Sequence, residues 1–300
     1  MERVIVIVGP TGVGKTKLSI ELAKHFNSEI INGDSVQIYK ELNIGSAKVS
    51  EEEMQGIKHH LLDFKEINED YTVYDYQKDL RNKIDEFNKK GLVPIIAGGT
   101  GLYLKAALYD YKFEKEDSNN FNSYENYSNE EIYNLLKEKD EKEALKLHPN
   151  NRKRVVRALN VINNLQGNKT EMLEKQEHKL LYDVVFVGLT LPRDVLYERI
   201  NKRVDLMIEK GLVEETKQLF EKYKDKNYKS FQAIGYKELF SYYKDEISYQ
   251  EAIELIKKKS RNYAKRQYTW FNNQFDVNWF EVDLENFSST IEKIISFLER

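Results

Sequence analysis

The chain of 300 residues contains no cysteine. Disulfides, thiolate nucleophiles and zinc sites built on cysteine are therefore excluded. Only four prolines occur, and Pro94, Pro149 and Pro192 fall near expected boundaries of helices or strands. An excess of positive charge is also lacking, because the formal net charge is −3. Any binding of RNA must then depend on local basic patches.

Long apolar runs are absent as well. None approaches the roughly 20 residues that a membrane-spanning helix requires. The first residues resemble a signal peptide, but the apolar run covers only Val4 to Val8 and leads directly into a glycine motif. We interpret this run as a buried strand, and we expect a cytoplasmic protein without membrane association.

What is present is an alternation of apolar runs with helical periods, which predicts an α/β core. Buried strands are expected at residues 4–8, 29–31, 92–97 and 183–191. Helical spacing of apolar residues predicts helices at 15–26, 74–88, 102–108, 195–210, 212–223 and 249–271. Two short apolar runs, 279–282 and 291–298, end the chain.

A glycine motif follows the first strand. It reads GPTGVGKT and satisfies G-x-x-x-x-G-K-[ST] at every fixed position. In such a loop the backbone amides and a helix N-terminus bind phosphate, Lys15 neutralises its oxygens and Thr16 holds Mg²⁺. The alternative is a strand-to-helix turn without a ligand. The residues predicted to bind diphosphate or nucleotide here are Gly9, Pro10, Thr11, Gly12, Val13, Gly14, Lys15 and Thr16.

The character of the sequence changes after Leu108. Residues 117–131 are polar and rich in asparagine, with little to bury. Helical patterns follow at 132–139 and 152–164, and the strand pattern returns at Asp183. We therefore expect a P-loop NTPase-like parallel sheet flanked by helices. This core would comprise residues 1–111 and 182–300, with a helical insertion domain at 112–181.

Asp34 comes directly after the second expected strand. A carboxylate at the carboxyl end of a strand in an α/β sheet faces the crevice where ligands bind, and it suits a general base. The alternative is structural, because Asp34 and Ser35 could cap a following turn. Motif and carboxylate together indicate a polyphosphate binder with a nearby base, and they do not define the reaction.

Eight sequence blocks resemble one family in their shared order. They read GPTGVGKT, DSVQIYKELNIGSAK, HHLLD, IAGGTGLYL, HPNNRKRVVRAL, LYERINKRVDLMIEKGLVEE, QAIGYKEL and AKRQYTWF. Over essentially its whole length the chain resembles the tRNA dimethylallyltransferases, also called tRNA isopentenyltransferases, of the bacterial type. The resemblance implies a Mg²⁺-dependent enzyme. It would transfer a dimethylallyl group from dimethylallyl diphosphate to the N6 amine of the tRNA adenosine next to the anticodon, releasing diphosphate.

The resemblance also implies roles for single residues. Asp34 matches the family's general base, and Thr100 matches a residue near the reacting amine, although it could instead be a helix N-cap. Arg199 and Arg203 lie four apart on an expected helix and share one face. The resemblance implies that both bind the diphosphate leaving group. Two guanidinium groups would stabilise the negative charge that grows on it. The alternative is a solvated stripe of charge.

Contacts with tRNA are expected from segments that match the family and from two basic helices. Interleaved aromatic residues in the second helix could stack unpaired bases, although Trp270 and Phe271 fit a protein core as well. The residues expected to contact tRNA are Asp34, Ser35, Val36, Gln37, Thr100, Lys153, Arg154, Val155, Val156, Arg157, Gln232, Gly235, Lys237, Arg261, Lys265 and Arg266.

Two rival interpretations use the same core. A small-molecule or nucleotide kinase would turn over ATP, and a noncatalytic RNA-binding protein would hold a nucleotide structurally. The favoured interpretation needs tRNA, dimethylallyl diphosphate and Mg²⁺, with the protein acting as a monomer. His59 and His60 are adjacent and would point apart, so joint metal ligation with Asp63 is not expected and we regard them as structural.

Overall fold

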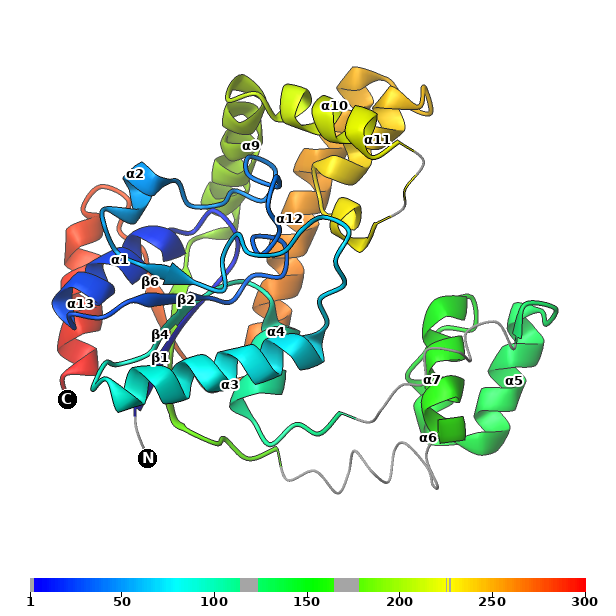
Figure 1. The fold of residues 1–300 in the computed structure, drawn as a ribbon, viewed down its shortest axis with the longest axis horizontal. Coiled ribbons are helices and arrows are strands. Elements are labelled where there is room, and N and C mark those ends of the chain that lie inside the picture. Colours follow the sequence, from blue (N-terminus) through cyan, green and yellow to red (C-terminus); the bar gives the residue numbers. More distant parts are fainter. Residues whose placement is uncertain (1–2, 114–123, 165–177, 225, 227) are drawn as a thin grey trace. The chain divides into compact units, whose positions relative to one another are not determined.

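The computed structural model describes residues 3–113, 124–164, 178–224, 226 and 228–300 (Figure 1). The chain divides into two compact units. Unit 1 combines residues 1–108 with 180–300, and unit 2 comprises residues 109–179. Unit 2 covers nearly the same stretch as the insertion expected from the sequence. Residues 117–123 of the expected asparagine-rich segment, and residues 165–177, lie outside the described residues.

Unit 1 is built on a six-stranded sheet with the order β3-β2-β4-β1-β5-β6. Its strands are β1 (Arg3–Val8), β2 (Ile30–Asn32), β3 (His59–His60), β4 (Ile95–Ala97), β5 (Asp183–Thr190) and β6 (Val277–Glu281). All neighbouring strands pair in parallel, and Ile5 of β1 lies between Ile95 and Val185. The predicted parallel α/β core is confirmed.

Nine α-helices and one 3₁₀ helix belong to the described part of unit 1. They are α1 (Lys15–His25), α2 (Glu51–Met54), α3 (Val73–Lys89), α4 (Gly101–Leu108), α9 (Arg193–Glu209), α10 (Leu212–Lys222), η2 (Lys229–Gln232), α11 (Tyr236–Tyr243), α12 (Tyr249–Gln274) and α13 (Phe287–Leu298). Side-chain oxygens start several of them: Thr72 forms a capping box before α3 and Ser248 forms one before α12. None of the helices in the described ranges is apolar over a length that would cross a bilayer.

The helices bury the sheet and one another. Helix α1 contacts β1, β2, β4 and α13, whereas α3 runs along α4 and α4 contacts α12 (Figure 1). Ile5, Ile7 and Leu18 are fully buried in this core. A second apolar cluster, which includes Leu212 and Leu239, joins α9, α10, α11 and α12. Through α12, this helical layer is continuous with the core.

Unit 2 is helical, with α5 (Asn129–Lys139), α6 (Glu141–Leu145) and α7 (Arg152–Asn164). Its own core includes Ile132, Leu136 and Leu159, all fully buried. Arg152 holds the chain before α5, because its guanidinium donates to the carbonyl of Tyr127 at 2.7 Å. The unit therefore has its own apolar core.

The strand order brings three loops together. In a parallel sheet the carboxyl ends of all strands lie at one edge, where α/β proteins bind ligands. Strand β4 lies between β1 and β2. The loop after β4, which contains Thr100, is therefore flanked by the glycine motif after β1 and by Asp34 after β2.

Candidate active site

The glycine motif forms a loop from β1 into α1. Gly9, Gly12 and Gly14 have φ angles of 135°, 83° and 113°, a region that other residues rarely adopt. Gly14 is the N-cap of α1, provides no side-chain cap, and is followed by a first turn without acidic residues. The free N–H groups and the positive end of the helix dipole therefore remain for an anion.

Lys15 lies inside this loop and is partly buried. Its ammonium group donates to the carbonyl oxygens of Gly9 and Pro10, each at 2.9 Å. Burial, followed by the nearby charge of Arg203, lowers the pKa of Lys15 to about 7, whereas Asp34 opposes this shift. An entering anion would reverse it. Lys15 and Asp34 therefore act on each other across the loops after β1 and β2.

Asp34 has the capping role considered from the sequence and keeps one oxygen free of it. Its Oδ1 accepts from the backbone N–H of Val36 at 2.8 Å and, at 3.4 Å, from that of Gln37, so the carboxylate does cap the turn. Asn32 fixes the residue from behind, because its Oδ1 accepts from the N–H of Asp34 at 3.1 Å. Oδ2 lies on the side of Gly99, where a Cβ added to the glycine would be 3.8 Å away. One oxygen orients the carboxylate while the other faces the loop after β4.

Thr100 stands immediately before α4, and its carbonyl accepts from the N–H of Leu104 at 3.3 Å. Its hydroxyl points to the Asp34 turn, where it accepts from the N–H of Ser35 at 3.0 Å and donates to the Ser35 hydroxyl at 3.2 Å. Thr100 therefore occupies the N-cap position while its side chain joins the loops after β4 and β2.

Arg199 and Arg203 approach the glycine motif from α9. Arg199 is exposed, and its Nε donates to the carbonyl of Gly12 at 3.2 Å. Arg203 is partly buried, and burial lowers its pKa, whereas the charges of Glu53 and Asp34 raise it. Arg203 therefore does not belong to a solvated stripe of charge, which was the alternative considered from the sequence. Two guanidinium groups, one ammonium group and one carboxylate thus gather at the loop after β1.

A cavity of about 270 Å³ opens beside the Asp34 turn. It is lined by Ser35, Val36, Tyr39, Tyr71, Lys229, Ser230, Gln232 and Ala233. The segments around residues 35 and 232, both expected to contact tRNA, therefore line one pocket together. Nearby, the Lys237 side chain is exposed, whereas Gly235 is buried and offers no side chain to a ligand.

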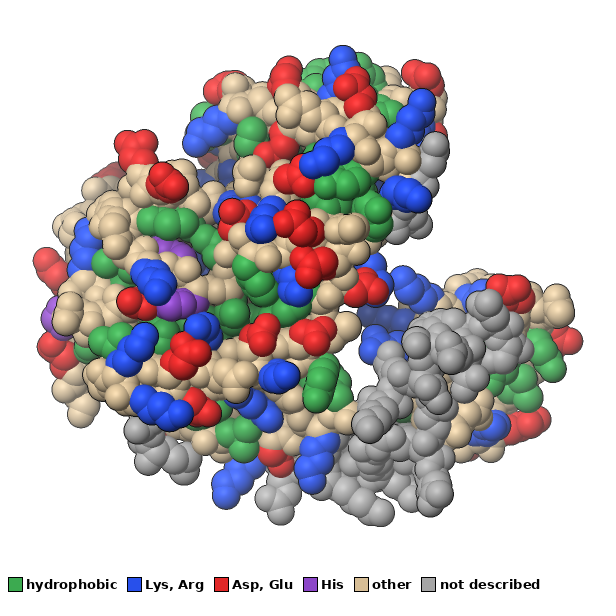
Figure 2. Space-filling model, viewed as in Figure 1, with side chains coloured by type: hydrophobic (Ala, Val, Ile, Leu, Met, Phe, Trp, Pro, Cys, Tyr) green, Lys and Arg blue, Asp and Glu red, His purple; other side chains and the backbone are tan. Residues whose placement is uncertain are grey.

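The remaining basic candidates divide by exposure. Lys265 and Arg266 on α12 are exposed, whereas Arg261 is partly buried and donates to Asn201 at 2.5 Å. On α7 the Lys153, Arg154 and Arg157 side chains are exposed, but Val155 and Val156 belong to the core of unit 2. The two valines therefore hold the helix and do not present side chains to RNA. On the face shown in Figure 2, Lys and Arg are interspersed with Asp and Glu.

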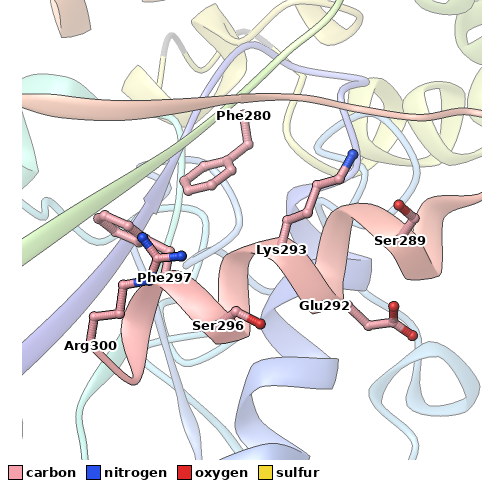
Figure 3. A pocket seen from close by; sticks show the side chains of 7 residues that line it. All are labelled: Phe280, Ser289, Glu292, Lys293, Ser296, Phe297 and Arg300. Carbon is pink, nitrogen blue, oxygen red and sulfur yellow. The ribbon is translucent and has the colours of Figure 1, made fainter.

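A larger cavity, of about 480 Å³, lies away from these loops. It is formed by β6, α13 and Arg300; the rings of Phe280 and Phe297 contact each other there, and Lys293 extends from the middle of α13 (Figure 3). No residue of the three loops lines it. Among the described residues, no cluster of three or more His, Asp or Glu side chains could hold a metal ion. His60 pairs with Glu29, and His59 bonds the carbonyl of Ile57, which are structural contacts.

Sequence reasoning missed three residues that hold these loops. Gln267 joins the loops after β1 and β4, whereas Asn32 and Glu215 bond to the segment after β2. Gln267 lies within the block AKRQYTWF and Glu215 ends the block that contains both arginines, so the resemblance carried a signal for them. Nothing in the local pattern distinguishes Asn32.

A parallel sheet, a glycine loop capping a helix, and cations gathered around that loop define a P-loop protein that binds a polyphosphate. A carboxylate beside the loop suits such a protein to transfer a group away from its phosphate ligand. The sequence model of the family described as IPP transferase matches residues 37–274. The chain belongs to this family.

Named relatives agree with this membership. The chain is 48% identical over 301 residues to the tRNA dimethylallyltransferase of Anoxybacillus flavithermus, covering 99% of this chain and 96% of the relative. A crystal structure of tRNA delta(2)-isopentenylpyrophosphate transferase from Staphylococcus epidermidis shares 40% identity, with a TM-score of 0.75 and coverage of 100% and 99%. A eukaryotic dimethylallyltransferase, described as acting on tRNA, shares 31% identity, with a TM-score of 0.87 and coverage of 98% and 78%.

Proposed function

We propose that this protein transfers a dimethylallyl group from dimethylallyl diphosphate to the N6 amine of the adenosine next to the anticodon of tRNA. One observation carries the proposal: the sheet places the glycine motif after β1 and Asp34 after β2 on either side of the loop that carries Thr100, whose hydroxyl bonds the Asp34 turn. A base and a diphosphate site therefore share one crevice, as transfer of a carbon group from a diphosphate requires. Family membership supports the same reaction.

The donor would bind by its diphosphate. The N-terminus of α1, Lys15 and the two arginines of α9 supply donors and positive charge to the phosphate oxygens. Thr16 would hold Mg²⁺ together with those oxygens and water, which fits a site without a carboxylate cage among the described residues. Bound Mg²⁺ would neutralise negative charge on the diphosphate.

Asp34 would act on the acceptor. The N6 amine is a weak nucleophile, because its lone pair is delocalised into the ring. A bond forms from N6 to the first carbon of the prenyl group while that carbon's bond to oxygen breaks, and the electron pair leaves with the diphosphate. Asp34 takes the proton from N6 through the oxygen not engaged in the turn. Arg199 and Arg203 stabilise the growing charge on the leaving group.

The adenosine must leave its stack to reach these groups. The cavity beside Ser35 and Gln232 is open next to Asp34 and provides polar and aromatic walls for nucleotides of the loop. Exposed cations on α7 and α12 would contact phosphates. The donor site and the base lie in unit 1 of a single chain, so a monomer suffices for the reaction.

The test combines purified protein, Mg²⁺, dimethylallyl diphosphate and unmodified tRNA, and detects prenylated nucleoside by mass spectrometry. Asp34→Asn keeps a side-chain acceptor for the turn and removes the base. We expect product with the unaltered protein and a rate about 10²–10⁴-fold lower for Asp34→Asn. Asp183→Asn, an exposed position at the start of β5, is the matched control and should leave the rate unchanged.

Two results would contradict the proposal. Absence of prenylated tRNA with the unaltered protein would remove the reaction, and phosphate transfer from ATP in a parallel assay would favour a kinase. If Asp34→Asn reacted at the full rate, Asp34 would not be the base.

A further inference from the structure

Gln267 of α12 joins the glycine motif, which is proposed to bind the prenyl diphosphate, to the loop after β4, which is proposed to lie beside the tRNA adenosine. Its Oε1 accepts from the backbone N–H of Thr11 in the glycine motif at 3.0 Å. Its Nε2 donates to the carbonyl of Gly99, next to Thr100, at 3.0 Å. One amide group thus spans the loops after β1 and β4. The side chain is only 5% exposed, so little water competes for these bonds.

A neutral amide satisfies both partners whatever the pH. Thr11 offers a donor and Gly99 offers an acceptor, so the bridging group must present an oxygen on one side and an N–H on the other. A carboxylate would place an acceptor against the Gly99 carbonyl, and an apolar side chain would leave both backbone groups without this partner. The amide of Gln267 therefore supplies the acceptor that Thr11 needs and the donor that Gly99 needs.

The surroundings preserve this bridge. A Cβ added at Gly99 would lie 2.3 Å from Nε2 of Gln267, so a larger residue at 99 would displace the amide. Tyr263, one turn earlier on α12, places its hydroxyl 3.4 Å from the same Gly99 carbonyl. Burial, then the charge of Asp34, raises the pKa of Tyr263, which therefore stays neutral as a donor. Two side chains of one helix thus fix the loop that carries Thr100.

We propose that Gln267 is a positioning residue that sets the distance between the bound diphosphate and the base. It touches neither substrate in this scheme; it fixes the loop that holds the leaving group relative to the loop that supports Asp34 through Thr100 and Ser35. The inference rests on the proposed prenyl transfer. Loss of the bridge lowers the fraction of bound complexes with aligned reacting atoms, and it leaves binding of either substrate largely intact.

The experiment measures single-turnover prenyl transfer with saturating donor and tRNA, together with separate Kd values for both. For Gln267→Met we expect the rate to fall by about 10–100-fold, because displacement by about 1 Å can cost that much. Both Kd values should stay close to those of the unaltered protein. Gly99→Ala, which pushes the amide away, should show the same pattern. Gln274→Met is the matched control, since Gln274 lies on the same helix and accepts from Lys105 instead.

A pH profile separates positioning from a general loss of structure. In Gln267→Glu, burial raises the pKa of the introduced carboxyl, and its protonated form can donate to Gly99 while accepting from Thr11. Its rate relative to the unaltered protein should therefore rise as the pH falls from about 8 to about 6. The relative rate of Gln267→Met should stay flat across the same range.

Other outcomes overturn the inference. If Gln267→Met reacts at the full rate or loses no more than Gln274→Met, Gln267 does not position the loops. A loss that appears only as weaker binding of donor or tRNA, or a flat profile for Gln267→Glu, also rejects the role. In each case the unaltered protein still makes product, and the proposed function stands. An inactive unaltered protein overturns the function and this inference together.

Discussion

Among single residues, Lys15 shows most clearly how a site is prepared for an anion. Burial, followed by the nearby charge of Arg203, makes its charged form costly without a ligand, although the ammonium group still donates to two loop carbonyls. A diphosphate would supply the missing negative charge and raise the pKa again. Ligand binding and protonation of Lys15 are therefore coupled.

This coupling predicts proton uptake on donor binding. The pKa of Lys15 is about 7 without ligand, so at a pH near 8 most of the protein must gain a proton as diphosphate binds. Affinity for diphosphate should fall as the pH rises above about 7. Calorimetry in buffers of different ionisation enthalpy measures the uptake, and Lys15→Arg should abolish it because arginine stays charged. Equal heats in all buffers would refute the coupling.

Among the helices and strands, the sequence predicts those with a strong apolar pattern. β1 and β5 are almost wholly apolar and are found where expected. β3 has only 2 residues, both histidines, and α11 (Tyr236–Tyr243) has only 8, so neither is long enough to show a clear period. The glycine motif and Asp34 were predictable because loop and carboxylate follow strands directly. Gln267 was not, because its partners lie 256 and 168 residues away in the chain.

Helix α10 also holds the loop that contains Ile44 and Gly45, which follows the Asp34 turn. The Glu215 carboxylate accepts from the N–H of Ile44 at 2.9 Å and from that of Gly45 at 3.3 Å. The buried hydroxyl of Tyr236 donates to it at 2.7 Å. Gln37, a residue of the Asp34 turn, donates from its side-chain amide to the Ser46 carbonyl of the same loop at 3.1 Å.

Removal of this carboxylate should destabilise the protein. Glu215→Ala leaves the loop amides and the Tyr236 hydroxyl without their acceptor, and we expect a loss of about 2–3 kcal/mol in the free energy of unfolding. Denaturant unfolding measures it. The neighbouring Glu214 is exposed, so Glu214→Ala removes the same charge from the same turn and should change stability little. Equal effects of both substitutions would mean that charge alone matters.

For the whole molecule, the two units divide the work. Unit 1 contains the loops to which the proposed function assigns donor binding and the base, whereas unit 2 has its own small core and an exposed basic face on α7. With a net charge of −3, overall attraction does not bring RNA to the protein. Local cations must therefore account for the dependence of RNA affinity on salt.

Neutralising two of these cations tests the role of unit 2. In Lys153→Gln with Arg154→Gln, the slope of log affinity for tRNA against log salt should decrease by about 0.7–0.9 for each phosphate that the protein no longer neutralises. Affinity for dimethylallyl diphosphate should not change. Lys137→Gln, an exposed position on α5 paired with Glu141, is the control. An unchanged slope in the double variant would exclude α7 from phosphate binding.

The distance along the chain between Thr11 and Gln267 has a consequence for protein synthesis. During synthesis the glycine motif is completed long before its bridging partner, because 256 residues separate Thr11 from Gln267. A nascent or prematurely terminated chain can thus contain the whole phosphate loop and still lack the amide that aligns it. Such a chain also lacks β6, which follows Gln267, so the bridge and the edge strand of the sheet are completed together.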